Sequence, residues 1–192
     1  LSVSVSLHHL CFCFFIYLFP PSLHLYQLNL GFQGDLTMSK NMETLMAELA
    51  MGVVPSIWRQ KPYDYPSMRT LGSWLINLRQ RIDQLQEWAM NPLEIPRVTW
   101  ISGLFNPQRF LTAILQVAAQ IQMLELDKLM ISTLVLKREV EDIETPARDG
   151  AYIHGLHLEG ARFDVQAGQL QACKPKEMSF QMPVLHVKAV PA

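Results

Sequence analysis

The residues best suited to bind a metal are His154, His157 and Glu159, which stand within six positions of one another. Imidazole and carboxylate groups are ordinary ligands of zinc and iron. Residues 150–160 resemble a β-strand bounded by glycines, and side chains of equal parity share one face of a strand. The two histidines would then point to opposite faces and could not share one metal. We therefore expect strand histidines with hydrogen-bond partners, and the same for His186.

Motifs for nucleotide binding and nucleophilic catalysis are missing from the sequence. Gly150 and Gly155 have the glycine spacing of a phosphate-binding loop, but Leu156 stands where that loop requires lysine. Neither G-x-G-x-x-G nor G-x-S-x-G occurs. The residues around Cys173 indicate a surface loop, and the acidic run from Glu139 to Glu144 is typical of a solvated loop. We predict a non-catalytic packing module with no cofactor or metal site of its own.

Composition narrows the class of protein. The 192 residues carry 16 Lys and Arg against 17 Asp and Glu, a net charge of −1 that offers no basic surface for nucleic acid. Hydrophobic residues make up 49% of the sequence, enough to build the core of one domain or of two small ones. Three cysteines are too few for a disulfide framework or a four-thiolate zinc site, which favours a reducing compartment.

The beginning of the sequence differs from the rest, because the first 34 residues include no Asp, Glu, Lys or Arg. Its apolar run from Leu10 to Phe19 has ten residues, half of the roughly 20 that a membrane-spanning helix needs. That length suits a signal peptide, the alternative interpretation, but a basic segment before the run and a small-residue cleavage site after it are both missing. We predict that residues 1–27 are an apolar extension foreign to the domain.

Three segments have the apolar spacing of helices. The first covers Met38 to Leu49 and stops at Gly52, and the second covers residues 70–89. The third follows Asn106, a suitable N-cap, with Pro107 at its first position. The third helix is apolar over more than one face, so we expect it to be largely buried.

After Leu129 the apolar pattern alternates with period two. Residues 130–136, 150–160 and 184–190 are rich in strand-forming residues, and Val98–Ile101 is a shorter extended run. Helices precede most of the strands, which favours an α+β fold over a doubly wound parallel sheet. We expect a helical part at 28–128 and a β part at 129–192.

Several longer stretches have a recognisable order and spacing. They include Gly34–Ser39, Leu71–Trp74, Trp100–Gln108 running into Phe110–Ile114, Gly150–Asp164 and Met182–Val184. Together they resemble the C-terminal domain of dynein heavy chains, most closely the axonemal outer-arm type. The resemblance covers about residues 28–192.

The resemblance implies a fold and a function. It implies helices followed by an antiparallel, barrel-like sheet that is incomplete because the sequence stops before the family's last strands. It also implies a non-catalytic segment that braces and regulates the AAA+ ring of a minus-end-directed microtubule motor for ciliary movement, with ATP bound in the ring and not here. The implied partners are that ring and, through the parent complex, intermediate chains, light chains and microtubules, but neither nucleic acid nor membrane. The implied location is the cytoplasm, cytoskeleton and ciliary axoneme. The alternative is a stand-alone protein-interaction module without motor activity.

The resemblance also selects residues that we expect to be structural or to lie at interfaces. One group should seat the third helix, and another should fix the strand at 150–160 and its following turn. Arg162 and Asp164 share parity, so an ion pair between them or with neighbours is a reasonable expectation. The full set is Trp74, Trp100, Phe105, Asn106, Pro107, Phe110, Tyr152, Gly155, Glu159, Gly160, Arg162 and Asp164.

Overall fold

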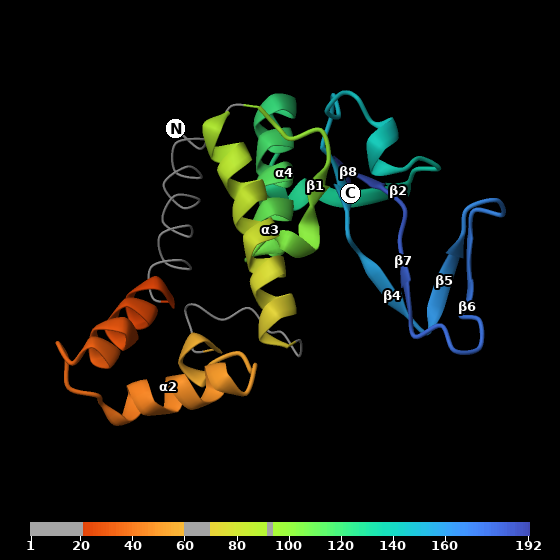
Figure 1. The fold of residues 1–192 in the computed structure, drawn as a ribbon. Coiled ribbons are helices and arrows are strands. Elements are labelled where there is room, and N and C mark those ends of the chain that lie inside the picture. Colours follow the sequence, from red (N-terminus) through yellow and green to blue (C-terminus); the bar gives the residue numbers. More distant parts are fainter. Residues whose placement is uncertain (1–20, 60–69, 92–93) are drawn as a thin grey trace. The chain divides into compact units, whose positions relative to one another are not determined.

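The computed structural model describes residues 21–59, 70–91 and 94–192, and the chain divides into two compact units, Leu1–Leu93 and Glu94–Ala192 (Figure 1). The first unit is helical in its described residues, and the second carries the strands. No helix in these three stretches combines the length and the apolar character that a membrane span requires.

Two of the helices described in the first unit have the apolar spacing predicted for them. Residues 21–33 are helical, α2 is Lys40–Ala50, the 3-10 helix η1 is Ser56–Arg59 and α3 is Leu71–Met90. Ser39 caps α2 by accepting a hydrogen bond from the Met42 backbone N–H at 3.4 Å, which satisfies a donor that the first turn leaves free. The two helices predicted at 38–49 and 70–89 are confirmed.

The buried stripe of α3 has the predicted period. Trp74, Leu78, Ile82 and Leu85 are buried, and their spacing of three and four residues places them on one helical face. Leu75 also fits the apolar spacing of this helix, but it is 46% exposed.

The second unit is built around a four-stranded sheet with the order β1-β3-β8-β2. The strands are β1 (Thr99–Trp100), β2 (Leu129–Val135), β3 (Ala151–His154) and β8 (Leu185–Pro191). β8 pairs antiparallel with both of its neighbours, whereas β1 runs parallel to β3. The sheet is therefore mixed, and its one parallel pair lies at the edge formed by β1.

Two smaller sheets complete the β part. β4 (His157–Glu159) pairs with β7 (Ser179–Gln181), and β5 (Ala161–Asp164) pairs with β6 (Gln169–Ala172), both antiparallel. Figure 1 shows these four strands together, apart from β2 and β8. Over the described residues the strands do not close into a barrel. The α+β fold class is confirmed, with small and mostly antiparallel sheets.

The prediction of one strand over residues 150–160 is wrong. Gly155 has φ +85°, a left-handed conformation that glycine adopts without a Cβ clash, and it ends β3. Leu156 follows, and β4 then belongs to another sheet. The inward apolar positions also change parity at this bend, from Ala151 and Ile153 in β3 to Leu158 in β4.

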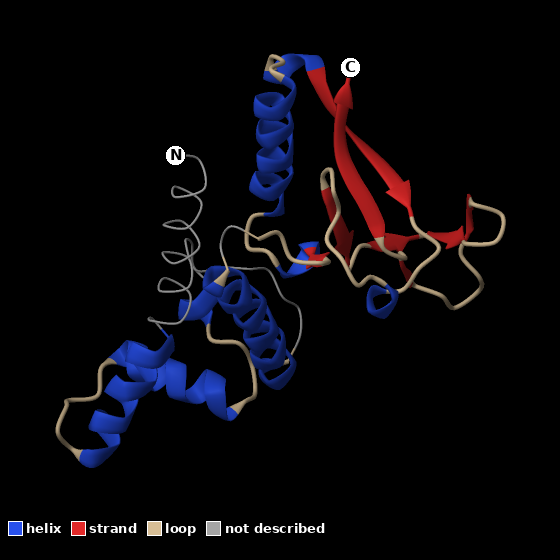
Figure 2. Cartoon of the chain, turned by 90° about the horizontal axis from the view of Figure 1, so that it is seen from above, coloured by secondary structure: helices blue, strands red, loops and turns tan. Residues whose placement is uncertain are grey.

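Helix α4 (Pro107–Gln122) packs one face on β2 and β8, as Figure 2 shows beside the red strands. The prediction that this helix is largely buried is wrong, because Ala118 is its one fully buried residue and Ile121 is 77% exposed. The sheet covers only part of the wide apolar face of α4, and Val117 and Ile121 at the margin of that face remain exposed. The 3-10 helices η2 (Ile101–Gly103), η3 (Leu126–Lys128) and η4 (Val140–Asp142) connect the main elements.

Candidate functional site

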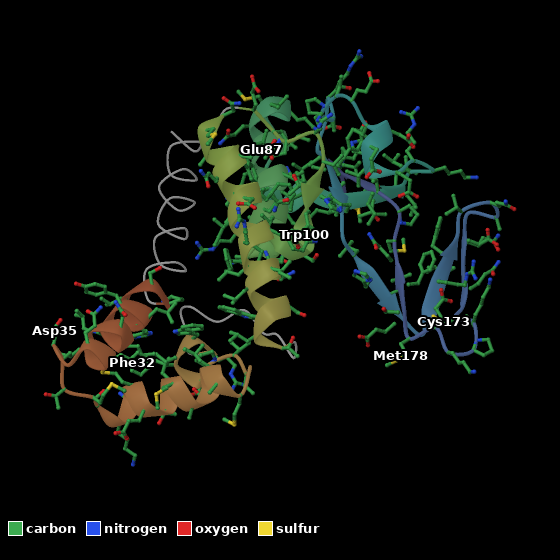
Figure 3. All side chains as sticks on the ribbon, in the orientation of Figure 1. Phe32, Asp35, Glu87, Trp100, Cys173 and Met178 are labelled. Carbon is green, nitrogen blue, oxygen red and sulfur yellow. The ribbon has the colours of Figure 1, made fainter. Side chains whose placement is uncertain are left out.

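The indole of Trp100 lies between two glycines of the second unit. Thr99 and Trp100 pair in parallel register with Ile153 and His154, which brings the next residue, Gly155, beside the indole. A Cβ on Gly155 would collide with the five-membered ring, and a Cβ on Gly103 would collide with the six-membered ring. Only glycine fits at either position. The contact fastens the turn η2 to the bend between β3 and β4, and Figure 3 labels Trp100 at this junction.

The turn before α4 is built as the sequence predicts. The Asn106 side chain accepts a hydrogen bond from the Arg109 backbone N–H at 3.2 Å, and Pro107 occupies the first helical position. Phe110 packs against a buried core cluster, while Phe105 is half-buried. The members of that cluster are Ile101, Ile153, Leu185 and Val187. Asn106 thus starts the helix that covers the sheet.

Two aromatic side chains meet across the antiparallel pair β3–β8. Tyr152 and His186 are opposite each other, and their ring centroids are 5.1 Å apart. The Nε2 atom of His186 lies 2.6 Å from the carbonyl oxygen of Asp149, so this nitrogen donates to the carbonyl. The expectation that His186 has a hydrogen-bond partner is confirmed.

The two histidines considered as metal ligands lie in different sheets. His154 is half-buried at the end of β3, and its burial lowers the pKa of the imidazole, an effect that the negative charge of Glu141 partly opposes. His157 and Glu159 are exposed on β4. The two histidines therefore do not lie on opposite faces of one strand, as predicted, because β3 and β4 belong to different sheets. Within the described residues no three His, Cys, Asp or Glu side chains gather as a metal site would require.

Asp164 organises the turn between β5 and β6. Its carboxylate accepts hydrogen bonds from the backbone N–H groups of Gln166 (2.9 Å) and Ala167 (3.1 Å) and from the Gln171 side chain (2.9 Å). These bonds favour the charged form, the Ala167 bond most strongly, and hold the pKa of Asp164 below its usual value of 3.8. Gly160, with φ +71°, precedes β5 and makes the turn out of β4 possible.

Arg162 forms a contact that the sequence did not predict. Its guanidinium lies over the ring of Phe180 on β7, 5.8 Å from the ring centroid, which joins the two small sheets. The expected ion pair with Asp164 is not formed at 4 Å or closer, because Asp164 bonds to its own turn. The positive charge of Arg162 still contributes, as the smallest of several causes, to the lowered pKa of Asp164.

Trp74 belongs to an aromatic cluster of the first unit. Its ring stacks on that of Trp58, with centroids 5.9 Å apart and planes inclined by 20°. The Trp58 indole N–H donates to Nδ1 of His24 at 3.2 Å, and partial burial lowers the pKa of His24. His24 therefore connects helical residues 21–33 to η1 and α3.

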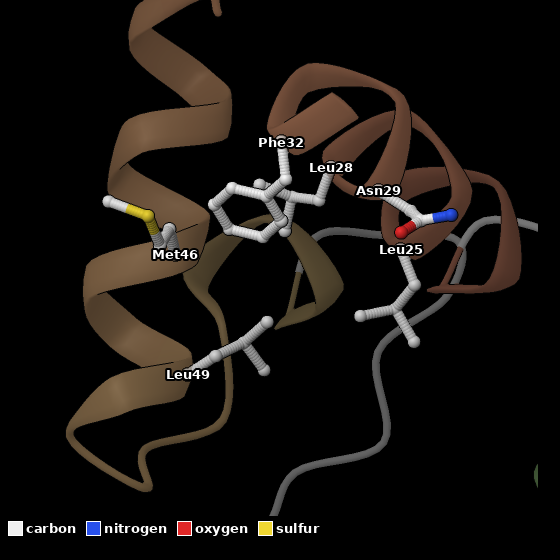
Figure 4. Close-up of a pocket in the computed structure, with 6 residues that line it drawn as sticks. All are labelled: Leu25, Leu28, Asn29, Phe32, Met46 and Leu49. Atoms are coloured by element: carbon white, nitrogen blue, oxygen red, sulfur yellow. The ribbon is translucent and has the colours of Figure 1, made fainter. Parts of the chain in front are cut away.

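An open apolar hollow lies between helical residues 21–33 and α2 (Figure 4). Its volume is about 290 Å³, at the lower end of the range for ligand pockets. Its lining is Leu25, Leu28, Asn29, Phe32, Met46 and Leu49. None of these side chains ionises, so the hollow offers a packing surface and no acid–base chemistry.

The roles of Gly103, Phe180 and His24 were not predicted from the sequence. Trp100 and Gly155 were both predicted to be structural, but the contact between them was not. Gly103 is three residues from Trp100, but only the turn η2 brings its Cα under the indole. His24 and Trp58 are 34 positions apart. No local spacing rule connects such residues, so only the packed structure could pair them.

The residues singled out in the sequence have packing roles in both units: tryptophans lie in the core, glycines lie against Trp100, and a capped helix covers the sheet. Such roles are typical of a non-catalytic structural domain. The protein belongs to the family formed by the C-terminal domain of dynein heavy chains, whose model matches residues 22–192. This finding confirms the resemblance drawn from the sequence, and the match includes residues 22–27, which the sequence alone set apart.

Curated relatives agree with the family. The "Dynein beta chain, flagellar outer arm" of Chlamydomonas reinhardtii is 51% identical over 166 residues, and the mouse "Dynein axonemal heavy chain 17" is 41% identical over 165 residues. The "Dynein alpha chain, flagellar outer arm" of Chlamydomonas reinhardtii is 40% identical over 168 residues. Each alignment covers 86% of this sequence but 4% of the relative. The protein therefore spans a small part of the length of these heavy chains.

Proposed function

We propose that this protein is a non-catalytic segment of an axonemal dynein heavy chain that braces and regulates the AAA+ ring of an ATP-driven, minus-end-directed microtubule motor for ciliary movement. The observation that carries the proposal is the match of residues 22–192 to the C-terminal domain of that family. The names of the relatives, which include flagellar outer-arm and axonemal heavy chains, support a place in the cytoskeleton of the ciliary axoneme.

The arrangement of the second unit supports a bracing role. Trp100 and a common apolar core connect helix α4, the turn η2 and the bend at Gly155. Because these elements are closely packed, a displacement of one of them displaces the others. Bracing requires such a stiff connection and needs no nucleotide site within the segment. In this proposal ATP binds in the parent ring, and intermediate chains, light chains and microtubules are partners only through the parent complex.

Three measurements test the proposal. The isolated 192-residue protein should not hydrolyse ATP above a boiled sample, and it should associate with a dynein heavy chain whose own C-terminal domain has been deleted. Restored control of the ring's ATPase on addition of the protein is the expected result. Sustained ATP turnover by the protein alone would contradict the bracing role, and a lack of association would favour a stand-alone interaction module.

A further inference from the structure

The side chain of His24 contacts the aromatic core of the first unit. Its Nδ1 atom accepts a hydrogen bond from the Trp58 indole N–H at 3.2 Å. Trp58 is 4% exposed and stacks on the equally buried Trp74, with ring centroids 5.9 Å apart. His24 itself is half-buried at the margin of this core. These three residues, called the His24 cluster below, connect helical residues 21–33 to η1 and α3.

The hydrogen bond determines the protonation state of His24. An indole nitrogen can only donate a hydrogen bond, so Nδ1 of His24 must accept it and carries no proton. The imidazole is then neutral, with its one proton on Nε2. A second proton would turn Nδ1 into a donor that faces the donor of Trp58. Only neutral His24 is therefore compatible with the contact.

Protonation of His24 would leave the Trp58 N–H without the acceptor that it has in this structure. The indole is almost completely buried, so water does not easily replace the lost partner. A buried donor without an acceptor costs free energy, and a positive imidazole beside it adds to that cost. Movement of His24 away from η1, together with helical residues 21–33, relieves both.

The charged residues of the first unit do not offset this effect. Partial burial is the one cause that lowers the pKa of His24 from its ordinary value of 6.5. On helical residues 21–33 the one other titratable side chain is Tyr26, and Asp35 follows in the next loop. The charged residues described on the other elements are Arg59 on η1, Lys40, Glu43 and Glu48 on α2, and Arg79, Arg81, Asp83 and Glu87 on α3. None of them contributes to the shift, so among the described residues no negative charge compensates a protonated His24.

We propose that the His24–Trp58 hydrogen bond is a pH-sensitive contact, which attaches helical residues 21–33 to η1 while His24 is neutral and releases them when His24 takes up a proton. The event is the uptake of one proton by Nδ1, and no covalent bond between heavier atoms changes. The proposal concerns regulation within the first unit and does not depend on the bracing role.

The direction of the pH dependence follows from the lowered pKa of His24. The unfolded chain binds the proton near the ordinary pKa of 6.5, whereas the folded protein binds it only at lower pH. The stabilisation from the His24 cluster is therefore fully present above 6.5 and is lost as the pH falls below that value toward the folded-state pKa. Histidine is the side chain best suited to such a change near physiological pH.

Nuclear magnetic resonance of the 192-residue protein tests the contact directly. The indole N–H resonance of Trp58, assigned by its loss in Trp58→Phe, is followed from about pH 8 to about pH 5, the range in which histidine titrates. We expect one transition with a midpoint below 6.5. Hydrogen exchange of residues 21–33, corrected for the intrinsic effect of pH, should rise by roughly tenfold through the same transition, since a buried donor loses its partner.

His24→Asn separates the titration of His24 from other effects of acid. The asparagine oxygen can accept from Trp58 but takes up no proton, so this variant should lose both transitions and keep residues 21–33 protected in acid. His24→Gln is a second variant of the same kind with a longer side chain. His157→Asn is the matched control, because His157 is exposed on β4 in the other unit, and it should titrate as wild type does.

Three results would overturn the proposal. In the first, the Trp58 resonance of the wild-type protein does not titrate. In the second, it titrates but the exchange of residues 21–33 does not rise with it. In the third, both transitions persist in a folded His24→Asn or His24→Gln protein, which would assign them to another group. Far-ultraviolet circular dichroism checks that each variant is folded.

Discussion

The contact of Trp100 with two glycines shows how a single residue type can decide local geometry. Gly155 needs a left-handed backbone to end β3, and it also needs to be free of a Cβ where the indole passes. Gly160 and Gly168 have similar positive φ values, but open space surrounds their Cα atoms. Substitutions at these three glycines therefore distinguish the free-energy cost of a strained backbone from that of a steric clash.

Gly155→Ala should destabilise the protein more than Gly160→Ala. Both substitutions force a Cβ into a left-handed conformation, but only the first drives it into the indole of Trp100. The additional loss in the free energy of unfolding should be about 1–3 kcal/mol. Urea unfolding of the full-length protein measures both, and equal losses would mean that the Trp100 contact yields easily.

The carboxylate of Asp164 makes the β5–β6 turn dependent on pH. Hydrogen bonds from Ala167, Gln166 and Gln171 lower the pKa of Asp164 in the folded state below 3.8. A lowered pKa means that the stabilisation is present above the unfolded-state value and is lost as the pH falls through the folded-state value.

Asp164→Ala should therefore be less stable than wild type near neutral pH, and this difference should shrink in acid as the wild-type carboxylate takes up its proton. Unfolding curves collected over a pH series measure the gap. Asp164→Asn is the control, because it keeps an acceptor for the turn but has no proton to gain. A gap that stays constant into acid would contradict the role of the charge.

At the scale of the element, the burial of α4 changes along its length. Its start at Asn106 and the packing of Phe110 and Ile114 were recognisable from capping and helical spacing. Ile121 continues the same spacing near the end of the helix but is 77% exposed, which contradicts the expectation of burial. An apolar residue on a helix reports that something covers it, but the sequence does not say whether that cover is in the same domain.

Asn106→Ala should destabilise the protein by about 0.5–2 kcal/mol, because the Arg109 backbone N–H loses its acceptor at the start of α4. Asn106→Asp should be close to wild type, since aspartate retains the acceptor and its charge suits the first turn. Thermal or urea unfolding of the three proteins gives the comparison. If the alanine variant were as stable as the aspartate variant, the cap would not be needed to hold α4 on the sheet.

At the scale of the whole molecule, the protein combines low charge with exposed apolar surface. Charged residues are 17% of the sequence and the net charge is −1, while several large apolar side chains lie on the surface of the second unit. An isolated protein with these properties tends to associate, because neither charge repulsion nor a polar surface opposes contact. The protein belongs to the family of dynein C-terminal domains, and its curated relatives are far longer polypeptides.

Helical spacing, capping and alternation in the sequence predicted the α+β class, the two long helices of the first unit and the cap at Asn106, because these features depend on residues close together in the sequence. The family was inferred separately, from the resemblance of several longer stretches to dynein C-terminal domains. The split of residues 150–160 at Gly155, the mixed sheet and the exposed side of α4 were decided by tertiary structure. Each depends on which distant segment arrives as a neighbour, as when Trp100 lies on Gly155 or Arg162 on Phe180. Such contacts are set by packing of the whole unit, and local propensity carries no record of them.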